Sequence, residues 1–458
     1  MDESTLVAEA LPTALVGSVA ETTGPLATVA DLPAPIGAVV SIAAAGGRAI
    51  EAEVVGFRGR LTLVSPLGDL TGVRRGAPAR LVRTKRRLRV GPALVGRVLN
   101  AHGDPIDGGP TPALAGRAAL DAAPPAAMDR PPIDAPLATG VRAIDTALSV
   151  GVGQRLGVFA GAGVGKSTLL GMVTRYTAAD VVVVGLVGER GREVNEFLAR
   201  DLGPEGRRRS VVVVATSDEP PIVRMRAAQT ATAVAEHFRD AGKNVLLLID
   251  SLTRVALASR EVGLAAGEPP ATRGFPPSTF ALLPKLVERA GRGATGSITA
   301  LYSVLVEGDD PDDPISDTLR GLLDGHVWLD RKLAARSHFP AIDVSQSVSR
   351  LMPAVTDEPH QRAAATLRRM LAALAENEDL ISIGAYRRGA NPAVDAALEL
   401  RPLIDALLQQ RVDQRVEFDP SVAALRQLAD RAEQLMNRPA ASAAAPAQAG
   451  PPPQRATA

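Results

Sequence analysis

The sequence predicts an α/β protein whose central, mostly parallel sheet is flanked by a small N-terminal β-barrel and a C-terminal helical domain. Three observations predict this fold. Between residues 137 and 350, short apolar runs alternate with helical stretches, which is typical of a parallel sheet covered on both faces. Short alternating apolar segments separated by glycines fill residues 37–66. After residue 355 a helical period dominates.

Composition limits the class of protein. The chain has 458 residues, 46% of them hydrophobic, which suits two to four domains at about 100–200 residues each. Lysine and arginine (51) balance aspartate and glutamate (50), so we expect no nucleic-acid partner. The lack of cysteine excludes disulfides and cysteine-bound metals, and it fits a reducing compartment. We expect neither a signal peptide nor a membrane span, because a basic N-terminal stretch and a run of about 18 apolar residues are missing.

The same patterns divide the chain into segments. We expect a flexible N-terminal segment (1–24), a barrel-like domain (25–100), an α/β domain with an incoming Pro/Ala-rich linker (101–355), a helical domain (356–438) and a disordered tail (439–458). Within the first segment, a short amphipathic helix and disorder are both compatible with Leu6, Val7, Ala10 and Leu11.

The barrel-like domain is predicted from three apolar segments, Ala38–Ile42, Ile50–Val55 and Leu61–Val64. A basic cluster follows it: Arg74, Arg75, Arg80, Arg83, Lys85, Arg86, Arg87 and Arg89. It is either a solvated barrel edge or subunit contact, or a patch for RNA or acidic lipid. No aromatic residues are interleaved with it, which weakens the RNA interpretation because bases stack on aromatic rings.

The central sheet is predicted from five apolar runs: Leu156–Ala160, Val181–Val187, Val211–Ala215, Val245–Ile249 and Ile298–Val306. Three helices are predicted after residue 355 from leucines and methionine at helical spacing: Leu367, Met370, Leu371 and Leu374; Leu398, Leu403 and Leu407; Leu425, Leu428 and Leu435. The second of these is interrupted at Pro402, because proline lacks an N–H and disturbs a helix interior.

A phosphate-binding loop is the strongest signal in the chain. Residues 160–167 read AGAGVGKS, with Ala160 where the strict pattern has glycine, between a predicted strand and a predicted helix over Ser167–Tyr176. Glycines let several backbone N–H groups point at one phosphate, and the helix N-terminus adds its positive end. Lys166 would reach the phosphates and Ser167 would bind Mg²⁺. The loop residues are Gly161, Ala162, Gly163, Val164, Gly165, Lys166, Ser167 and Thr168.

Two further motifs follow apolar strands. Asp250 ends the run 245–249, where such sites place a carboxylate associated with Mg²⁺. Glu189 and Arg190 follow the run 181–187, so they lie at the carboxyl edge of the sheet, where open α/β sheets bind ligands. Glu189 could align an attacking water and Arg190 could face phosphate charge. The alternative is a loop of salt bridges that only caps the next helix.

Taken together, these motifs resemble the flagellar and type III secretion ATPases, which are relatives of the rotary ATP synthase catalytic subunit. The resemblance covers about residues 25–435. It rests on GVRAID (140–145), FAGAGVGKS (159–167), GLVGERGREV (185–194), LLLIDSLTR (246–254), GEPPATRGFPPS (267–278), GSITALYSVL (296–305), LDGHVWLDRKLA (323–334) and HFPAIDVSQSVSR (338–350).

The resemblance implies a role for each candidate residue. Lys166, Ser167 and Asp250 would bind Mg-ATP, and Glu189 would activate water. Arg190 would help to neutralise phosphate charge. Arg350 would enter the site of a neighbouring subunit as an arginine finger. Phe339 would lie against adenine, where relatives often have tyrosine.

The resemblance also implies an assembly and partners. A finger that acts in trans implies a homohexamer. The family's N-terminal segment binds a stator-like regulator, and its helical domain contacts a central stalk-like protein and the export substrates with their chaperones. Membrane components of the export gate complete the expected set, at the cytoplasmic face of the membrane. The stretches 175–181 and 267–278 look more flagellar than virulence-associated.

Three other classes of protein fit the sequence less well. A rotary ATP synthase or vacuolar-type subunit fits the 184–305 stretches less well. A transcription-terminator-like RNA translocase needs aromatic residues in its N-terminal domain, whereas the first 130 residues contain only Phe57. A module that binds nucleotide without hydrolysing it would be expected to lack Glu189 or Arg350, and both are present.

Overall fold

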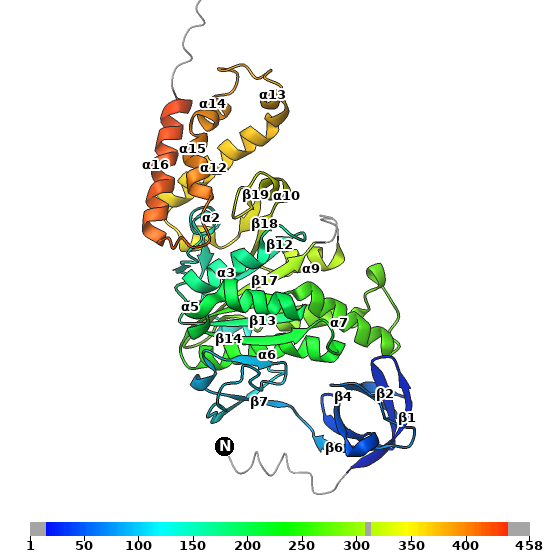
Figure 1. Ribbon diagram of the computed structural model, residues 1–458. Helices are drawn as coiled ribbons and strands as arrows, with labels where there is room; N and C mark the ends of the chain where they lie inside the picture. The colour runs from blue at the N-terminus through cyan, green and yellow to red at the C-terminus, as the bar shows by residue number, and fades with distance from the viewer. Residues whose placement is uncertain (1–14, 307–312, 438–458) are drawn as a thin grey trace, which may run out of the picture.

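The computed structural model describes residues 15–306 and 313–437. Figure 1 shows three parts in a row: a barrel at one end, an α/β domain in the middle and a helical domain at the other end. The proposed N-terminal amphipathic helix and the tail 439–458 lie outside the described residues. Among the described helices, none combines the length and apolarity that a membrane span requires.

The N-terminal part is a closed six-stranded barrel with strand order β1-β2-β5-β4-β3-β6. Its strands are β1 (Val16–Thr23), β2 (Leu26–Ala30), β3 (Val39–Ala43), β4 (Ala49–Arg58), β5 (Leu61–Pro66) and β6 (Pro78–Arg83). The three predicted apolar segments are confirmed as β3, β4 and β5. The expectation of a flexible segment over 1–24 is wrong for residues 16–23, because β1 pairs with both β2 and β6 and closes the barrel.

The barrel also ends earlier than the expected residue 100. Beyond β6 come β7 (Arg87–Val90), β8 (Val98–Asn100) and β9 (Gly116–Ala119). β7 pairs with β9, so the expected linker contains a strand, and β8 pairs with β14 as the edge of the central sheet. These strands have three or four residues each, which is too short for a hydrophobic period to reveal them.

The central sheet has the order β19-β18-β12-β17-β15-β13-β14-β8, with β16 beside β17. Its neighbours are parallel except for the pairs β18–β19 and β16–β17. The five predicted strands are confirmed within two residues at each end. The strands of this part are β10 (Pro136–Leu137), β11 (Val150–Gly151), β12 (Arg155–Ala160), β13 (Val181–Glu189), β14 (Ser210–Thr216), β15 (Asn244–Asp250), β16 (Gly291–Arg292), β17 (Ser297–Leu305), β18 (Gly325–Leu329) and β19 (Ile342–Ser349).

Helices cover both faces of this sheet, which explains why strands such as β13 are buried throughout (Figure 1). Alternate residues of β13 enter two different cores: Val182 and Val184 pack on the side of α3, and Val181 and Val183 on the side of α6. The helices are α2 (Arg142–Ala147), α3 (Lys166–Tyr176), α4 (Gly191–Glu196), the π-helix η4 (Phe197–Leu202), α5 (Gly203–Arg208), α6 (Pro221–Asp240), α7 (Leu252–Ala265), α8 (Pro277–Val287), α9 (Pro314–Leu322) and α10 (Arg331–Ala335). Single 3₁₀ turns lie at Ala45–Gly47, Pro92–Leu94, Ala127–Asp129 and Thr272–Gly274.

The C-terminal part consists of helices. Their side chains Leu367, Ile404 and Leu425 belong to the same hydrophobic core as the residues of α3. The predicted break at Pro402 is confirmed, because one helix ends at Glu399 and the next begins at Arg401. The helices are α11 (Met352–Val355), α12 (Glu358–Glu376), α13 (Glu378–Ser382), α14 (Pro392–Glu399), α15 (Arg401–Leu408) and α16 (Phe418–Met436).

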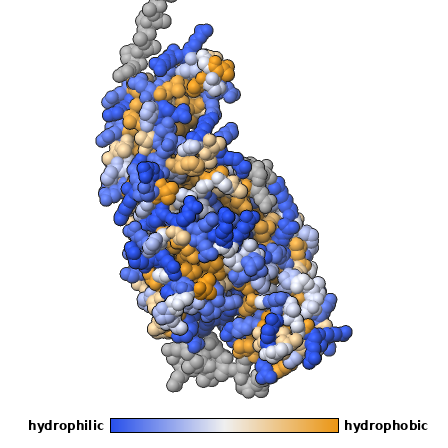
Figure 2. Space-filling model, viewed as in Figure 1, coloured by the Kyte–Doolittle hydropathy of each residue, from blue (hydrophilic) through white to orange (hydrophobic). Residues whose placement is uncertain are grey.

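The basic cluster makes contacts within the chain. Arg83 pairs with Glu51 at 3.0 Å, Arg86 bonds to His102, and Arg89 donates to a backbone oxygen. These contacts favour the barrel-edge interpretation over a free basic patch. On the face drawn in Figure 2, hydrophilic side chains are widely spread and hydrophobic ones lie among them.

A buried ion pair joins α6 to the turn that follows α8. The Nε and Nη2 of Arg289 donate to the two carboxylate oxygens of Glu236 on α6, at 2.8 and 2.6 Å, and both residues are buried. Glu236→Ala leaves the arginine charge buried and unpaired, so we expect a loss of about 3–5 kcal/mol in the free energy of unfolding. Urea denaturation measures this change in the free energy of unfolding. The double change Glu236→Leu with Arg289→Met should restore most of the loss, and an equally unstable double variant would contradict the charge explanation.

Candidate functional site

The phosphate loop connects β12 to α3 at the carboxyl edge of the sheet. Gly163 and Gly165 have φ values of 79° and 90°, a left-handed conformation that glycine adopts without strain. Open space surrounds the position of a Cβ at Gly163, so the backbone angle rather than crowding requires glycine there. Ala160 is a regular strand residue paired with Leu305 and Leu329, which explains why alanine is accepted in place of the expected glycine.

Lys166, Asp250 and Ser303 meet beside this loop. They come from α3, β15 and β17, whose strands lie next to β12 in the sheet. The Nζ of Lys166 forms an ion pair with Asp250 Oδ1, and the Ser303 hydroxyl donates to the same oxygen at 2.5 Å. Burial disfavours the charge of Asp250, but Lys166 and Ser303 outweigh it and hold the pKa of this carboxyl below its ordinary value. Asp250 is therefore an ionised, buried carboxylate next to the phosphate loop.

Glu189 ends β13, which β17 and β15 separate from β12, and it lies at the same edge of the sheet. Its side chain is largely buried and binds Arg254 at 2.5 Å, while Arg254 also donates to the Gly188 oxygen at 2.8 Å. Burial, the negative charge of Asp250 and a hydrogen bond with Glu193 together raise the pKa of Glu189 to about 7. Glu189 can thus exchange a proton near neutral pH, which suits a general base.

Arg190 lies apart from this cluster. It precedes α4, its side chain is 80% exposed, and its ion-pair partner is Glu193 at 3.6 Å. Ser167 is exposed at the start of α3, beside Lys166. The structure therefore brings together Lys166, Ser167, Asp250 and Glu189, whereas Arg190 points into solvent.

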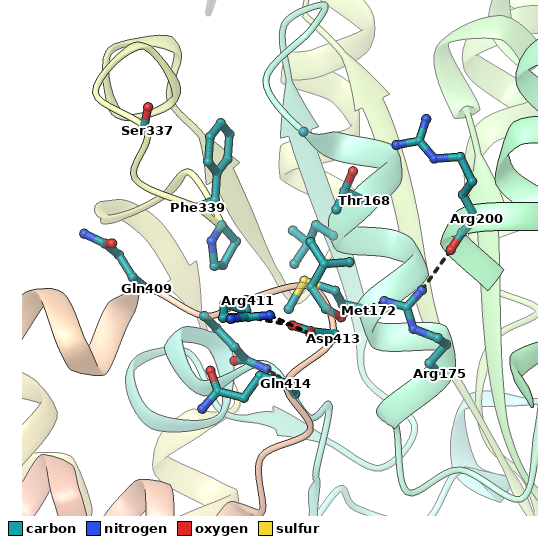
Figure 3. A pocket seen from close by; sticks show the side chains of 15 residues that line it. Thr168, Met172, Arg175, Arg200, Ser337, Phe339, Gln409, Arg411, Asp413 and Gln414 are labelled. Carbon is teal, nitrogen blue, oxygen red and sulfur yellow. Dashed lines mark hydrogen bonds and ion pairs between the residues drawn. The ribbon is translucent and has the colours of Figure 1, made fainter. Parts of the chain in front are cut away.

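A cavity of about 860 Å³ lies on the other side of the phosphate loop. Phe339 borders it from one side and Thr168 and Met172 of α3 from the other (Figure 3). The Phe339 ring is 44% exposed and would lie 3.7 Å from a Cβ at Gly165. The volume falls within the range of about 300–1,000 Å³ that is usual for small-molecule sites, and the ring offers a surface on which a planar base can stack.

The segment 409–414 between α15 and α16 forms the floor of this cavity, where Arg411 and Asp413 pair (Figure 3). The buried side chain of Gln410 anchors the segment: its oxygen accepts from Arg142 N at 2.8 Å, and its nitrogen donates to Gly140 O at 2.9 Å. The helical domain thus contributes one wall of the cavity.

Sequence reasoning missed several residues of this site. Arg254 stands at the end of the motif LLLIDSLTR, one helical turn after Asp250, and this spacing is a signal that could have identified it. Ser303 and Gln410 lie about 50 and 160 residues from Asp250 in the sequence. The residues around them form no pattern that predicts a place in the site. Only the pairing of β15 with β17 and the fold of the helical domain bring them to the site.

Arg350 follows β19 at the opposite end of the sheet strands. Its backbone N–H donates to Asp324 O at 3.0 Å, and Asp324 N donates to Arg155 O, at the beginning of β12. The phosphate loop follows the other end of β12, which is six residues or about 20 Å long. Arg350 is exposed and lies too far from the phosphate loop of its own chain to touch a phosphate there.

The site has the groups that Mg-ATP needs. The loop N–H groups, the α3 N-terminus and Lys166 suit phosphates, and the Ser167 hydroxyl and the Asp250 carboxylate supply oxygen donors. Among residues 15–306 and 313–437, no group of three or more His, Asp or Glu side chains forms a metal cage. Mg²⁺ usually keeps several waters and is shared with substrate phosphates, so the two oxygen donors Ser167 and Asp250 would suit it.

The chain is similar to proteins of known kind over most of its length. A model of the nucleotide-binding domain of the ATP synthase alpha/beta family matches residues 140–349, and a model of the T3SS EscN ATPase C-terminal domain matches residues 356–427. The flagellum-specific ATP synthase of Bacillus subtilis (strain 168) is 49% identical over 387 residues, 84% of this chain and 88% of that protein. The type 3 secretion system ATPase of Pseudomonas syringae pv. syringae is 50% identical over 83% of this chain and 86% of that protein.

A solved structure agrees with these sequence matches. The assembled ATPase EscN from the enteropathogenic E. coli type III secretion system has a TM-score of 0.86 and 44% identity, and the match covers 90% of this chain and all of that one. EscN in complex with its central stalk EscO matches with a TM-score of 0.83 and 43% identity over 90% of this chain and 100% of that one. The resemblance predicted from the motifs is confirmed: the chain belongs to the family of flagellar and type III secretion ATPases.

Proposed function

We propose that this ATP hydrolase serves a flagellar protein export apparatus, where it hydrolyses Mg-ATP at the interfaces of a homohexamer to release and unfold export substrates. The observation that carries the catalytic part is the convergence of Lys166, Asp250 and Glu189 at one sheet edge, beside a cavity of nucleotide size. A non-flagellar type III secretion ATPase is the second candidate, because flagellar and non-flagellar relatives match at nearly equal identity.

In the proposed reaction each residue acts through its position. Lys166 binds the β- and γ-phosphates, and Ser167 and Asp250 hold Mg²⁺, which supplies positive charge to the phosphoryl oxygens when bound. Glu189 in its ionised form orients a water in line with the γ-phosphate, and Arg254 holds the Glu189 carboxylate in place. Gly161 to Thr168 surround the phosphates and Phe339 stacks on the adenine. Arg190 is assigned to neutralise phosphate charge, which requires it to leave Glu193.

The neighbour's Arg350 completes the proposed site. The length of β12 supports this assignment, because it separates Arg350 from the phosphate loop of its own chain. An arginine supplied in trans stabilises the charge of the transition state and is worth about 10³–10⁵ in rate in P-loop enzymes. One chain carries both the phosphate loop and the finger, so a closed ring of identical copies makes every interface competent.

We extend the proposal to partners by analogy with the family. These are a central stalk-like protein and substrate–chaperone complexes at the helical domain, a stator-like regulator at the N-terminus, and membrane components of the export gate. The expected location is the cytoplasmic face of the membrane. Deletion of the gene in a flagellated host should abolish filaments if the flagellar assignment is right, and normal filaments would favour the second candidate.

The first catalytic test replaces the proposed base. Glu189→Gln should bind ATP as the wild type does but hydrolyse it at least tenfold more slowly, since an amide cannot take a proton. Phosphate release and binding of a fluorescent ATP analogue measure the two properties. Glu196→Gln is the matched control, because within the described part of the chain this carboxylate on α4 pairs with the exposed Arg192 alone. Normal hydrolysis by Glu189→Gln would contradict the assignment.

The pH dependence of turnover tests the same residue. Burial and neighbouring acidic groups raise the pKa of Glu189 to about 7, so its active, ionised form is lost as the pH falls through 7 rather than through the usual carboxyl range. We expect kcat to fall about tenfold per pH unit below this value. A kcat that stays constant down to pH 5 would show that no group with this pKa takes part.

A mixing experiment tests the finger in trans. Lys166→Ala and Arg350→Ala copies should each be inactive, for loss of the phosphate site and of the finger. When they are mixed in equal amounts before assembly, about one interface in four combines an intact phosphate loop with an intact finger. Hydrolysis should therefore reappear at up to about a quarter of the wild-type rate. A mixture as inactive as its components would refute catalysis across the interface.

A further inference from the structure

A buried glutamine fixes the chain on both sides of the proposed finger. Gln154 lies immediately before β12, and its side chain is fully buried. Its Nε2 donates to Ser349 Oγ at 3.1 Å and to Asp324 O at 3.3 Å, while its Oε1 accepts from Gly151 N at 2.7 Å. Both donated bonds therefore go to the segments that flank Arg350 in space.

These two segments have further attachments to the same place. The Ser349 hydroxyl donates to Ser149 O at 2.9 Å. Asp324 O accepts the Arg350 N–H at 3.0 Å, and the Asp324 carboxylate accepts from Arg155 N at 2.9 Å. Gln154 is thus the centre of a hydrogen-bonded group that joins the start of β12, the start of β18 and the end of β19.

The backbones of β18 and β19 pack closely together next to Arg350. Gly325 of β18 lies opposite Ser349 of β19, and a Cβ on it would lie only 2.3 Å from Val348 O. The backbone of β19 therefore runs in direct contact with the backbone of β18 just before Arg350. A small shift of either strand changes the direction in which Arg350 leaves the surface.

Within the described residues, the side chain of Arg350 receives little support of its own. It is exposed, and the hydrogen bond it makes is a 3.5 Å contact from Nη2 to Arg320 O. The place from which the guanidinium starts is therefore set by its backbone, which Asp324, Ser349 and Gln154 hold.

We propose that Gln154 is a positioning residue for Arg350: its buried amide fixes the backbone from which the finger reaches into the neighbouring subunit. The inference rests on the proposed role of Arg350 in trans. Gln154 itself touches no nucleotide, because it lies at the end of β12 opposite the phosphate loop. Catalysis is sensitive to such positioning, since a displacement of about 1 Å can cost roughly 10²-fold in rate.

The test compares two variants in the full-length protein. Gln154→Met keeps the length of the side chain but removes all three hydrogen bonds, and Ser349→Ala removes one of them. We expect kcat for ATP to fall about tenfold or more in Gln154→Met, and less in Ser349→Ala, with KM little changed because the nucleotide cavity is intact. If Gln154→Met fails to fold, Ser349→Ala carries the test. Ser210→Ala is the control: Ser210 begins β14, its buried hydroxyl donates to Gly206 O, and its loss should leave turnover at the wild-type rate.

A mixing experiment separates positioning from general damage. Arg350→Ala copies supply the phosphate loop, and Lys166→Ala copies supply the finger. Adding Gln154→Met to the copy that supplies the finger should lower the recovered rate about tenfold, whereas adding it to the copy that supplies the phosphate loop should leave that rate unchanged. Equal loss in both arrangements would overturn the inference, because the substitution would then act on the whole subunit.

The single variants distinguish a failure of the Gln154 role from a failure of the Arg350 role. If Arg350→Ala is slow but Gln154→Met and Ser349→Ala turn over like the wild type, the positioning role of Gln154 is wrong and the finger stands. If Arg350→Ala hydrolyses ATP at the wild-type rate, the proposed function of Arg350 is wrong, and the positioning role of Gln154 is then wrong as well.

Discussion

The site depends on the parallel pairing of four neighbouring strands, β12, β17, β15 and β13. Parallel neighbours end at the same edge, so the phosphate loop, Ser303, Asp250 and Glu189 lie close together, although Lys166 and Ser303 are 137 residues apart in the sequence. The register is specific: Leu186 lies opposite Asp250, and Ile249 opposite Tyr302. Burial of these strands on both faces fixes that register, because a shift by one residue would turn every side chain to the other face.

The same sheet separates the two halves of the proposed reaction. Its carboxyl edge holds the buried Lys166–Asp250 pair, where we propose that Lys166 binds phosphate and Asp250 helps to hold Mg²⁺. Its opposite edge holds Arg155, Asp324 and the base of Arg350. One arginine side chain cannot span a strand of about 20 Å. Under the proposed function, each subunit therefore supplies the phosphate loop of one site and the arginine of another. On this proposal, oligomerisation is required for the reaction itself.

Much of the fold and of the candidate site could be predicted from the sequence. The remaining features depend on contacts between distant residues, which a local pattern does not show. Apolar strands and the phosphate loop carry local signals, so β12 and α3 and the carboxylate of Asp250 followed from spacing. The barrel strand β1 and the sheet edge β8 did not, because tertiary pairing rather than a period makes them strands. Contacts such as that of Gln410 with Gly140 join residues 270 apart, which local reasoning cannot foresee. Arg190 shows the converse, since a motif position predicts a role but not the direction of a side chain.

The central claim is that a second copy completes the site. Its most direct test measures ATP hydrolysis and the mass distribution of the purified chain together, over a dilution series that spans assembly and dissociation. The account predicts a specific activity that rises in proportion to the assembled fraction and vanishes in the monomer, since a monomer lacks a finger at its phosphate loop. A monomer that hydrolyses ATP as fast per chain as the assembled protein would contradict it.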